Sequence, residues 1–462
     1  MNPKTEITRL VDSRFKVCAD HILMLQPSCF GYNIETGHSN PFQNQPVNID
    51  SVRIGLEFTA AVEQLNNYGV NVNVLQQSAN CISPDAVFLN NWFSTHQNGT
   101  LIVYPMESLI RRTEVIPQFD QYFGSIGFRV NDFIDLREIT QPNQFLEGTG
   151  SLVFNHSAKE LYATLSSRTN KKLIELTAQR LDYKYKLINS ATSPAVYHTN
   201  VMMSVGQNYI VLCDEVLVEK SFLKFLEQTT SKTIIKIDHS QMASFCGNII
   251  ELDSENGPVI CLSERSLRSF KKEQLRVLEA NGDICPIEIS NIEHIGGGGI
   301  RCMIAENFLP QIQSSDNGMQ LVSPITETEF NDYFSLRWDV LRAPWNQPKG
   351  SEIADDEVGA EHYMVYSLEN ELMAVGRIHA IDNNTAQFRY MAVAPKYQSS
   401  GVGSFLLSSM IQISKHQGFK NIYLDARENA VDFYLKHGFK KIDKTYLLFG
   451  EIQHYSMNKV VD

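Results

Sequence analysis

Short apolar runs alternate with segments of helical periodicity over most of the first 310 residues, and this alternation restricts the chain to α/β folds. The first unit contains an apolar run over 21–26, a polar loop, helical spacing of apolar residues over 51–68 and an alternating run over 70–75. Further units of roughly 50–60 residues follow without matching sequences. Repeated αβ units of this kind predict a closed, quasi-symmetric arrangement.

The later units give the same signals. Strands are predicted over 101–104, 151–154, 160–164, 208–213, 233–237 and 259–262, and helices over 111–123 and 170–182. Residues 311–318 are polar and lack periodicity, which indicates a linker. We therefore expect one domain over residues 1–315 and a second α/β domain over residues 316–462.

Charge and composition exclude several classes of protein. The net charge of −12, with no basic tract longer than a pair, argues against nucleic-acid binding. No apolar run reaches the roughly 18–20 residues that span a bilayer, and the polar stretch over 1–12 lacks the apolar core of a signal peptide. The eight cysteines show no CxxC spacing, and the one CxxH, Cys18 to His21, has no second pair. We expect a cytoplasmic protein with reduced thiols, no disulfide, no metal and no membrane partner.

A run of four glycines, Gly296 to Gly299, comes shortly before Cys302. Glycine tolerates positive φ and allows a ligand to approach the backbone closely, so such a run usually marks a site. A cysteine just beyond it can act as a nucleophile if its neighbours lower its pKa. The alternative is a buried structural cysteine behind a flexible loop.

Three further polar clusters stand next to apolar runs. Glu147 lies at a glycine turn, His198 precedes an apolar run, and Asp85, Asn90 and Asn91 flank another. Each has an ordinary structural explanation, as a turn or cap residue, a loop carboxylate or a hydrogen-bonded buried histidine. Together with the cysteine they form a Cys/His/carboxylate set, which recurs in covalent catalysis on planar electrophiles.

These segments resemble the pentein superfamily of amidinotransferases and deiminases. The exact residues of their motifs resemble the citrulline-utilization hydrolase branch of that superfamily. The matching motifs are PSCFGYNIET (27–36), PDAVFLNNWFSTH (84–96), EGTGSLVF (147–154), SSRTN (166–170), YHTNVMMSVG (197–206) and GGGIRCMIAE (297–306). The resemblance implies a five-bladed α/β propeller that acts on guanidines and needs no cofactor.

The resemblance also implies catalytic roles. Cys302 would attack the guanidinium or ureido carbon, and His198 would protonate the leaving amine and then activate the water that resolves the adduct. Glu147 would hold the cationic nitrogens and keep His198 protonated. The residues that would bind the substrate are Asp85, Asn90, Asn91 and Arg168.

Two of these substrate-binding positions leave alternatives open. Arg168 could clamp a substrate carboxylate or be a structural arginine. Asn91 stands where guanidine deiminases place a second carboxylate, and a neutral amide weakens the preference for a cationic guanidinium. A ureido substrate such as citrulline therefore stays open beside arginine. Water or an amine could resolve the intermediate, so the residues leave hydrolase and amidinotransferase open.

The second domain contains an apolar run, a glycine turn over 398–404 and then an amphipathic segment. In this pattern, backbone N–H groups and a helix N-terminus bind a pyrophosphate, although a glycine turn alone is commonly just a tight turn. A second motif, LDARENAVDFYLKHGF, follows at 424–439. Together the two motifs resemble the GNAT N-acetyltransferase superfamily, which implies an acetyl-CoA-dependent enzyme with a mixed β-sheet.

The resemblance assigns roles in this domain too. Tyr434 would protonate the departing thiolate, unless it only packs the core. The residues that would bind acetyl-CoA are Val393, Gln398, Ser399, Gly401, Val402, Gly403, Ser404 and Asn429. Arg389 and Gln387 occupy the stretch where some relatives carry a base, so the base would be Glu361, His362 or a water molecule. The residues that either line the acceptor side or pack the first helix are Trp338, Arg342 and Trp345.

The sequence thus predicts a bifunctional enzyme. A Cys-dependent hydrolase or amidinotransferase for a guanidino or ureido amino-acid derivative would be fused to an N-acetyltransferase for a small amine. The alternative is an amidinotransferase with a GNAT module that senses acetyl-CoA without turnover. A homodimer is left open.

Overall fold

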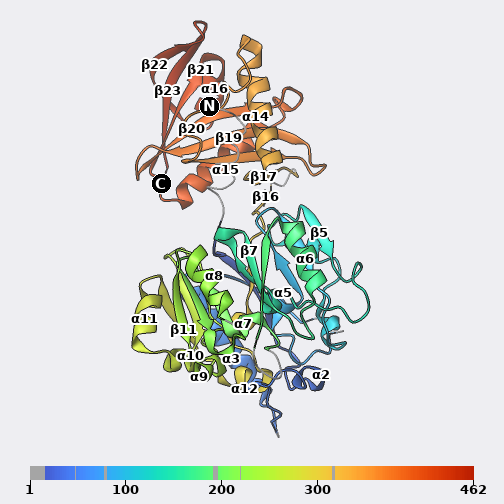
Figure 1. Cartoon of the computed structure of the whole chain (residues 1–462). Helices are drawn as coiled ribbons and strands as arrows, with labels where there is room; N and C mark the ends of the chain where they lie inside the picture. The colour runs from blue at the N-terminus through green and yellow to red at the C-terminus, as the bar shows by residue number, and fades with distance from the viewer. Residues whose placement is uncertain are drawn as a thin grey trace. The chain divides into compact units, whose positions relative to one another are not determined.

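The computed structural model describes residues 16–46, 48–77, 81–190, 196–218, 220–314 and 318–461. The chain forms two compact units (Figure 1). The N-terminal unit comprises Lys16–Tyr122 and Val130–Leu309, and the C-terminal unit comprises Pro310–Asp462 with the short segment Phe123–Arg129.

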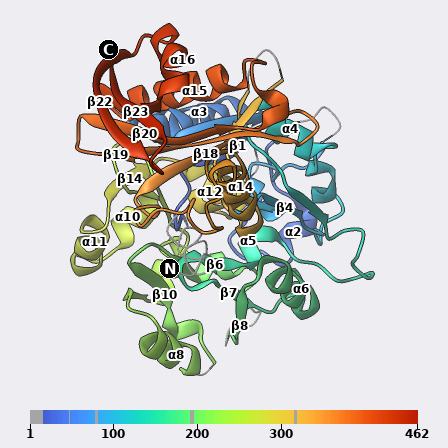
Figure 2. The same cartoon turned by 90° about the horizontal axis from the view of Figure 1, so that it is seen from above.

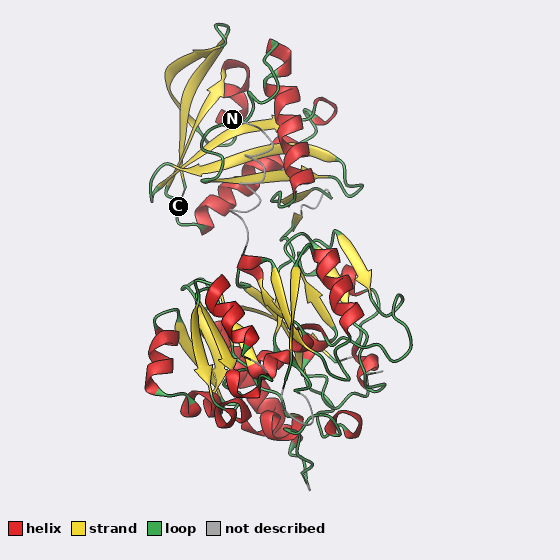
Figure 3. Cartoon of the chain, in the orientation of Figure 1, coloured by secondary structure: helices red, strands yellow, loops and turns green. Residues whose placement is uncertain are grey.

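Five three-stranded sheets form the N-terminal unit within the described residues (Figure 3). Each has one antiparallel and one parallel neighbour beside its central strand. The sheets are β15 (Ala305–Asn307), β1 (His21–Gln26) and β2 (Asn71–Gln76); β3 (Phe93–Thr95), β4 (Thr100–Val103) and β5 (Asp132–Asp135); β6 (Val153–Asn155), β7 (Glu160–Thr164) and β8 (Lys184–Ile188); β9 (Met203–Val205), β10 (Tyr209–Cys213) and β11 (Thr233–Ile237); and β12 (Ile250–Leu252), β13 (Val259–Ser263) and β14 (Asp283–Ile287). One local design is thus repeated in all five sheets.

The sheet β15-β1-β2 joins the two ends of the unit. His21 of β1 pairs with Asn307 of β15 in antiparallel register, and β1 also pairs along its whole length with β2 in parallel register. A parallel pair needs a long crossover, and the helix α3 (Ser51–Asn67) supplies it. The strand, loop, helix and strand that the sequence predicts for the first unit are therefore observed.

Helices connect the strands of these sheets, and several of them lie at the margin of the unit (Figure 2). Those of the N-terminal unit not yet named are α2 (Ile34–Gly37), η1 (Leu89–Asn91), η2 (Arg111–Glu114), α5 (Gly148–Ser151), η3 (His156–Ala158), α6 (Lys171–Leu181), α7 (Thr199–Met202), η4 (Asp214–Val216), α8 (Ser221–Thr229), α9 (His239–Ala243), α10 (Glu264–Ser269), α11 (Lys272–Glu279), α12 (Ser290–Gly296) and α13 (Ile300–Met303). The strand predicted over 151–154 begins only at Val153, because Ser151 belongs to α5. The helix predicted over 111–123 is broken into η2 and α4 (Phe119–Ser125).

The C-terminal unit is built on one mixed sheet of eight strands among the described residues. In order across the sheet they are β16 (Gln313–Ser314), β17 (Gln320–Val322), β18 (Ala360–Tyr366), β19 (Leu372–Ala380), β20 (Thr385–Val393), β21 (Asn421–Arg427), β23 (Ile452–Val460) and β22 (Lys440–Leu448). Only β20 and β21 form a parallel pair, and their register runs from Thr385↔Asn421 to Gln387↔Tyr423. Beyond these three positions the two strands separate.

Two helices cover opposite faces of this sheet. Leu406 and Met410 of α15 (Val402–His416) share a core cluster with Ala374 of β19. Phe330 of α14 (Glu327–Leu341) shares another with Val375, the next residue of the same strand. Successive side chains of a strand point to opposite faces, so the helices lie on opposite sides. The remaining helices are η5 (Ala343–Trp345), η6 (Pro395–Tyr397), η7 (Glu428–Ala430) and α16 (Val431–Lys436).

Within the described part of the chain, no helix is both long enough and apolar enough to cross a membrane.

The β1 strand offers a test of the N-terminal fold. Ile22 is fully buried in the core around β1, whereas Val74 on the neighbouring β2 is 37% exposed. We expect Ile22→Ala to lower the free energy of unfolding of this unit by about 2–5 kcal/mol, and Val74→Ala by less than about 1 kcal/mol. Urea unfolding followed by hydrogen exchange of peptides from residues 16–309 measures both. Equal losses in the two variants would contradict the packing described.

Candidate active sites

Most predicted residues of the N-terminal unit lie in or directly before four short helical turns, whereas Asp85 and Arg168 lie outside them. Each turn precedes the antiparallel edge strand of a different sheet. η1 leads into β3, α5 into β6, α7 into β9 and α13 into β15. α5 packs against η1 and α7, and α13 packs against η1. The repeated design thus brings together residues more than 200 positions apart in the sequence, from Asn90 to Cys302.

Glu147 and His198 form a buried hydrogen-bonded pair. His198 Nε2 lies 2.8 Å from Glu147 Oε2, and both side chains are almost fully buried. Burial alone would raise the pKa of the Glu147 carboxyl, but Arg168 and His198 hold it well below its usual range. Burial lowers the pKa of His198 more than Glu147 raises it. The expectation that Glu147 keeps His198 protonated therefore stays a prediction.

Arg168 is held mainly by groups of the protein. Its Nη1 lies 3.4 Å from Glu147 Oε2, and its Nη2 donates to the carbonyl of Thr36 at 2.9 Å and to Ser39 Oγ at 2.5 Å. Its guanidinium also lies over the ring of Tyr197. These contacts are those of a positioning residue, while the clamp on a substrate carboxylate stays a prediction.

Cys302 lies in the first turn of α13, behind the glycine run, and is 5% exposed. Asn248 Nδ2 lies 3.3 Å and Asn200 Nδ2 3.7 Å from its sulfur. Burial raises the pKa of the thiol, and the two amides and Arg301 lower it only in part. In the ligand-free protein the thiol is thus protonated near neutral pH.

Asp85 and Asn91 belong to a buried polar network. The carboxylate of Asp85 accepts hydrogen bonds from Asn33 Nδ2 at 2.8 Å and Thr36 Oγ1 at 3.0 Å. Asn91 Oδ1 accepts one from Arg111 Nη1 at 2.7 Å. Asp85 thereby fixes the loop before α2, and its contact with a substrate head group stays a prediction.

Several buried amide atoms at this site have no hydrogen-bond partner among the described residues. They are Nδ2 and Oδ1 of Asn90, Nδ2 of Asn91 and Oδ1 of Asn200. An ideal Cβ on Gly150 would contact Asn91 Nδ2 and lie 2.8 Å from His198 Nδ1. Because buried polar groups are normally paired, unpaired amides beside a histidine and a thiol mark a place for a polar ligand.

Sequence reasoning missed Asn248, Asn200 and Arg111. Asn248 comes two residues before β12, the antiparallel edge strand of the fifth sheet. The four predicted clusters likewise stand shortly before the corresponding strands of the other four sheets. That equivalence is a signal that could have found it. Asn200 lies inside the motif YHTNVMMSVG (197–206), but the resemblance assigns it no role. The burial of Arg111, which pairs with Glu114 at 2.7 Å, has no signal in the sequence.

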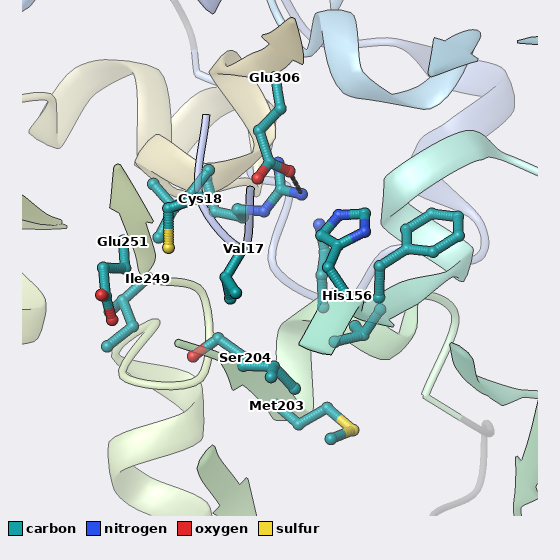
Figure 4. A pocket seen from close by; sticks show the side chains of 14 residues that line it. Val17, Cys18, His156, Met203, Ser204, Ile249, Glu251 and Glu306 are labelled. Atoms are coloured by element: carbon teal, nitrogen blue, oxygen red, sulfur yellow. Dashed lines mark hydrogen bonds and ion pairs between the residues drawn. The ribbon is translucent and has the colours of Figure 1, made fainter. Parts of the chain in front are cut away.

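A cavity of the N-terminal unit lies close to α13 (Figure 4), and its described lining does not include Glu147, His198 or Cys302. Its lining includes Cys18, His156, Ser204, Glu251, Arg301 and Glu306, and also Asn200. Burial raises the pKa of Glu251 and Glu306 and lowers that of His156 to about 3. Burial thus favours the neutral forms of these groups, and we do not assign the substrate to this cavity.

In the C-terminal unit, the glycine turn has the predicted backbone. Ser399 has φ +63° and Gly401 φ +91°, and Gly401 is the N-cap of α15 without a side-chain hydrogen bond to the helix. The first N–H groups of a helix lack intrahelical partners, so those of Val402, Gly403 and Ser404 can bind phosphate oxygens. Asn429 lies in η7 and is exposed.

A cavity of about 430 Å³ lies where β20 and β21 separate, beside the C-terminal end of α14. Its polar lining includes Arg342, Gln387, Arg389, Tyr390, Asp425, Arg427, Tyr434, Tyr446 and His454. Tyr434 Oη lies 3.7 Å from Met391 Sδ, and burial raises its pKa to about 12. The phenol is therefore protonated at neutral pH, as a general acid must be. Of the three residues proposed for the acceptor side, Arg342 lines this cavity.

The base candidates Glu361 and His362 are not among the lining residues. Glu361 bonds Gln417 and Tyr363, and His362 is fully buried next to Glu357. His454 lines the cavity instead, because it pairs in register with Arg427 across β21 and β23. Its Nδ1 lies 3.0 Å from the Ile452 carbonyl, and burial lowers its pKa. Sequence reasoning missed it, since it lies beyond both motifs.

Comparison with known proteins identifies both parts of the chain. Residues 26–309 match the family described as N,N dimethylarginine dimethylhydrolase, eukaryotic, and residues 330–439 match the GNAT acetyltransferase family. The uncharacterized N-acetyltransferase YjcF of Bacillus subtilis (strain 168) is 29% identical over 141 residues, which are 30% of this chain and 99% of that protein. Streptothricin acetyltransferase A of the same organism is 27% identical over 112 residues, 22% of this chain and 65% of that protein.

Solved structures give the same picture of the fold. The N-terminal domain of ArgZ, an arginine dihydrolase from the ornithine-ammonia cycle in cyanobacteria, superposes with a TM-score of 0.50 at 15% identity, covering 63% of this chain and 99% of that one. AgrE, solved with ornithine and NAD+, has a TM-score of 0.50 at 12% identity and covers 95% of this chain and 48% of its own. The resemblance to penteins and to GNAT enzymes is confirmed, and assignment to the citrulline-utilization branch stays a prediction. The chain thus belongs to the N,N-dimethylarginine dimethylhydrolase family of pentein enzymes and carries a C-terminal domain of the GNAT acetyltransferase family.

Proposed function

We propose that the N-terminal domain hydrolyses a guanidino or ureido amino-acid derivative through a covalent intermediate on Cys302. Arginine, its N-methylated derivatives and citrulline are the candidate substrates. The observation that carries this proposal is the buried Glu147–His198 pair beside unpaired amide atoms. Asn200, two residues after His198 in the chain, lies 3.7 Å from the sulfur of Cys302 and connects the pair to the thiol. We also propose that the two domains span residues 1–315 and 316–462. The five sheets would be the five blades of a propeller.

The first chemical step needs a thiolate. Burial raises the pKa of the Cys302 thiol and lowers that of His198, and thus favours the neutral form of both groups. A guanidinium placed beside the sulfur lowers the thiol pKa, since an opposite charge favours the anion. The sulfur attacks the guanidinium carbon, and the leaving amine departs as its C–N bond breaks. His198 takes the proton that the thiol loses and then gives it to that amine as the amine departs.

The second step releases the product. His198, now neutral, takes a proton from a water molecule that attacks the carbon of the thiouronium adduct. The C–S bond then breaks, the sulfur regains its electron pair, and a ureido product leaves. Glu147 acts through His198, because its carboxylate stabilises the transiently charged imidazole. Unpaired amides of Asn90 and Asn91 would hydrogen-bond the flat nitrogen-rich group.

The C-terminal domain would transfer an acetyl group from acetyl-CoA to a small amine. The uncapped N-terminus of α15 and the turn at Ser399 and Gly401 suit the pyrophosphate, with Val393, Gln398 and Asn429 as the further predicted contacts. Acetyl-CoA supplies the activated acyl carbon. Tyr434 would protonate the departing thiolate, and His454 would accept the proton that the attacking amine loses.

The tautomer of His454 supports this role. A neutral imidazole whose Nδ1–H donates to the Ile452 carbonyl leaves the lone pair of Nε2 to accept a proton. Burial and the charges of Arg427 and Arg342 favour this neutral form, against the opposite effects of the hydrogen bond to Ile452 and of Asp425. Small-molecule substrates fit both domains, and we expect the enzyme in the cytoplasm, as a monomer or homodimer.

Intact-mass analysis tests the hydrolase. Incubation with arginine, N,N-dimethylarginine or citrulline should give a transient adduct with the mass of the substrate minus the departing amine. Cys302→Ser should abolish the adduct, and the same change at the exposed Cys29 should leave it unchanged. Turnover without any adduct on Cys302 would contradict the mechanism. If the amidino group of the substrate were found on an added amine, the domain would be an amidinotransferase and not a hydrolase.

Gly150→Ala tests the geometry around His198. The new methyl group would collide with the imidazole and with Asn91, and misplaced catalytic groups cost about 100-fold in rate. We expect hydrolysis to fall by that order while acetyl transfer is kept. Gly55→Ala is the control, because nothing lies within 4 Å of its Cβ. Unchanged hydrolysis in Gly150→Ala would place the reaction elsewhere.

The pH profile of acetyl transfer tests His454. Only the neutral imidazole accepts a proton, so kcat/KM should rise with pH through a pKa below the ordinary histidine value of about 6.5. His454→Gln should slow the reaction and remove this acidic limb. His437→Gln is a matched control, because His437 Nδ1 likewise lies 2.9 Å from a backbone carbonyl but outside the cavity lining. An acidic limb retained in His454→Gln would exclude this base.

A further inference from the structure

The cavity between β20 and β21 has an excess of positive charge. Arg342, Arg389 and Arg427 line it, and Asp425 is the acidic residue of its described lining. Arg389 is compensated, because its Nη1 lies 2.9 Å from Asp356 Oδ2. Arg342 and Arg427 form no ion pair with a carboxylate in the part of the chain that the structure describes.

The two uncompensated arginines converge on one point. Arg342 Nη1 and Arg427 Nη2 lie 3.1 Å and 3.2 Å from the same carbonyl oxygen, that of Leu341 at the end of α14. Burial lowers the pKa of both guanidinium groups. Both side chains are partly buried, and two cations this close repel each other, so an anion between them is favoured.

Aromatic rings hold both groups in place. The guanidinium of Arg427 lies 4.4 Å from the ring centroid of Trp345, and that of Arg342 lies 5.5 Å from Phe449 and 5.7 Å from Tyr390. Stacking fixes the plane of a guanidinium, and its fork of N–H donors then matches the two oxygens of a carboxylate.

We propose that the acceptor of the acetyltransferase is an amine that also carries a carboxylate, an amino acid or a close derivative, and that Arg342 and Arg427 bind this carboxylate. The inference rests on the proposed acetyl transfer. Asp425 supplies an opposite charge for the acceptor's ammonium group, and Tyr434 and His454 line the same cavity. Its volume of about 430 Å³ suits a ligand of this size.

Two other ligands fit the same surface less well. The phosphates of acetyl-CoA have their own site at the N-terminus of α15, and none of the residues 398–404 belongs to the described lining. A polyamine or another polycation would meet two uncompensated arginines and be repelled.

Matched amines that differ only in the carboxylate test the inference. Ornithine is compared with 1,4-diaminobutane, and lysine with 1,5-diaminopentane, as acceptors of the full-length protein. Acetylated product is measured by mass spectrometry. We expect kcat/KM to be at least about 10-fold higher for the amino acid of each pair, because a site built for a polar group discriminates against its absence.

Variants connect the preference to the two arginines. Arg427→Gln and Arg342→Gln should each raise KM for the amino acid by about 10- to 100-fold, with KM for acetyl-CoA unchanged. Arg427→Lys, which keeps the charge but loses the fork, should fall between. Lys420→Gln removes an exposed positive charge outside the lining and should change neither constant.

The outcomes separate this inference from the proposed function. Equal use of the decarboxylated amines would overturn the inference while acetyl transfer stands, and so would a preference for O-phosphoethanolamine. If no amine is acetylated, the proposed acetyl transfer is wrong, and calorimetry on the CoA-saturated protein then tests the carboxylate site by itself. Tighter binding of ornithine than of 1,4-diaminobutane would support the site, and equal binding would overturn it. A raised KM for acetyl-CoA in Arg427→Gln would assign the arginines to the cofactor.

Discussion

The antiparallel pairing of β15 with β1 is the contact on which the N-terminal site depends. It joins residues 21–23 to residues 305–307, and α13 with Cys302 comes directly before β15. α13 itself packs against η1 and β13, and the pairing fixes the strand that follows it. The loop that the pairing closes is long, but closure entropy grows only slowly with length. A few backbone hydrogen bonds and the core around Ile22 are therefore enough to position the thiol.

Charge compensation is the second constraint, and the two domains handle it differently. In the hydrolase domain the buried carboxylate of Glu147 lies against Arg168 and His198, while burial favours the neutral forms of the Cys302 thiol and the His198 imidazole. In the acetyltransferase domain Arg337 and Arg377 are balanced by Glu357, whereas the arginines of the cavity are not. A charge that is partly withdrawn from water and has no ion-pair partner is costly for the fold, so the presence of Arg342 and Arg427 beside Tyr434 has a functional explanation.

Much of this architecture could be predicted from the sequence. Apolar runs gave β1, β7 and α6 almost to the residue, and the glycine run, Glu147 and His198 led to segments that do meet in space. Local signals failed where pairing between distant strands decides the result. Asn248 follows no recognisable motif, and His454 reaches the acetyltransferase cavity only because β23 pairs with β21. The strand predicted from Ser151 failed because Gly148, at φ +41°, starts a helical turn there.

The unpaired amides of Asn90, Asn91 and Asn200 have a consequence for the energetics of the ligand-free hydrolase domain. Removing amide groups from water without giving them new hydrogen bonds costs each of them about 1–3 kcal/mol. Folding therefore carries a penalty at these atoms in the described site. A bound molecule that completes their hydrogen bonds cancels it, so occupancy and conformational stability are thermodynamically linked. The free energy lost by desolvating these amide atoms is thus regained when a planar, nitrogen-rich ligand binds, and it contributes to the affinity for that ligand.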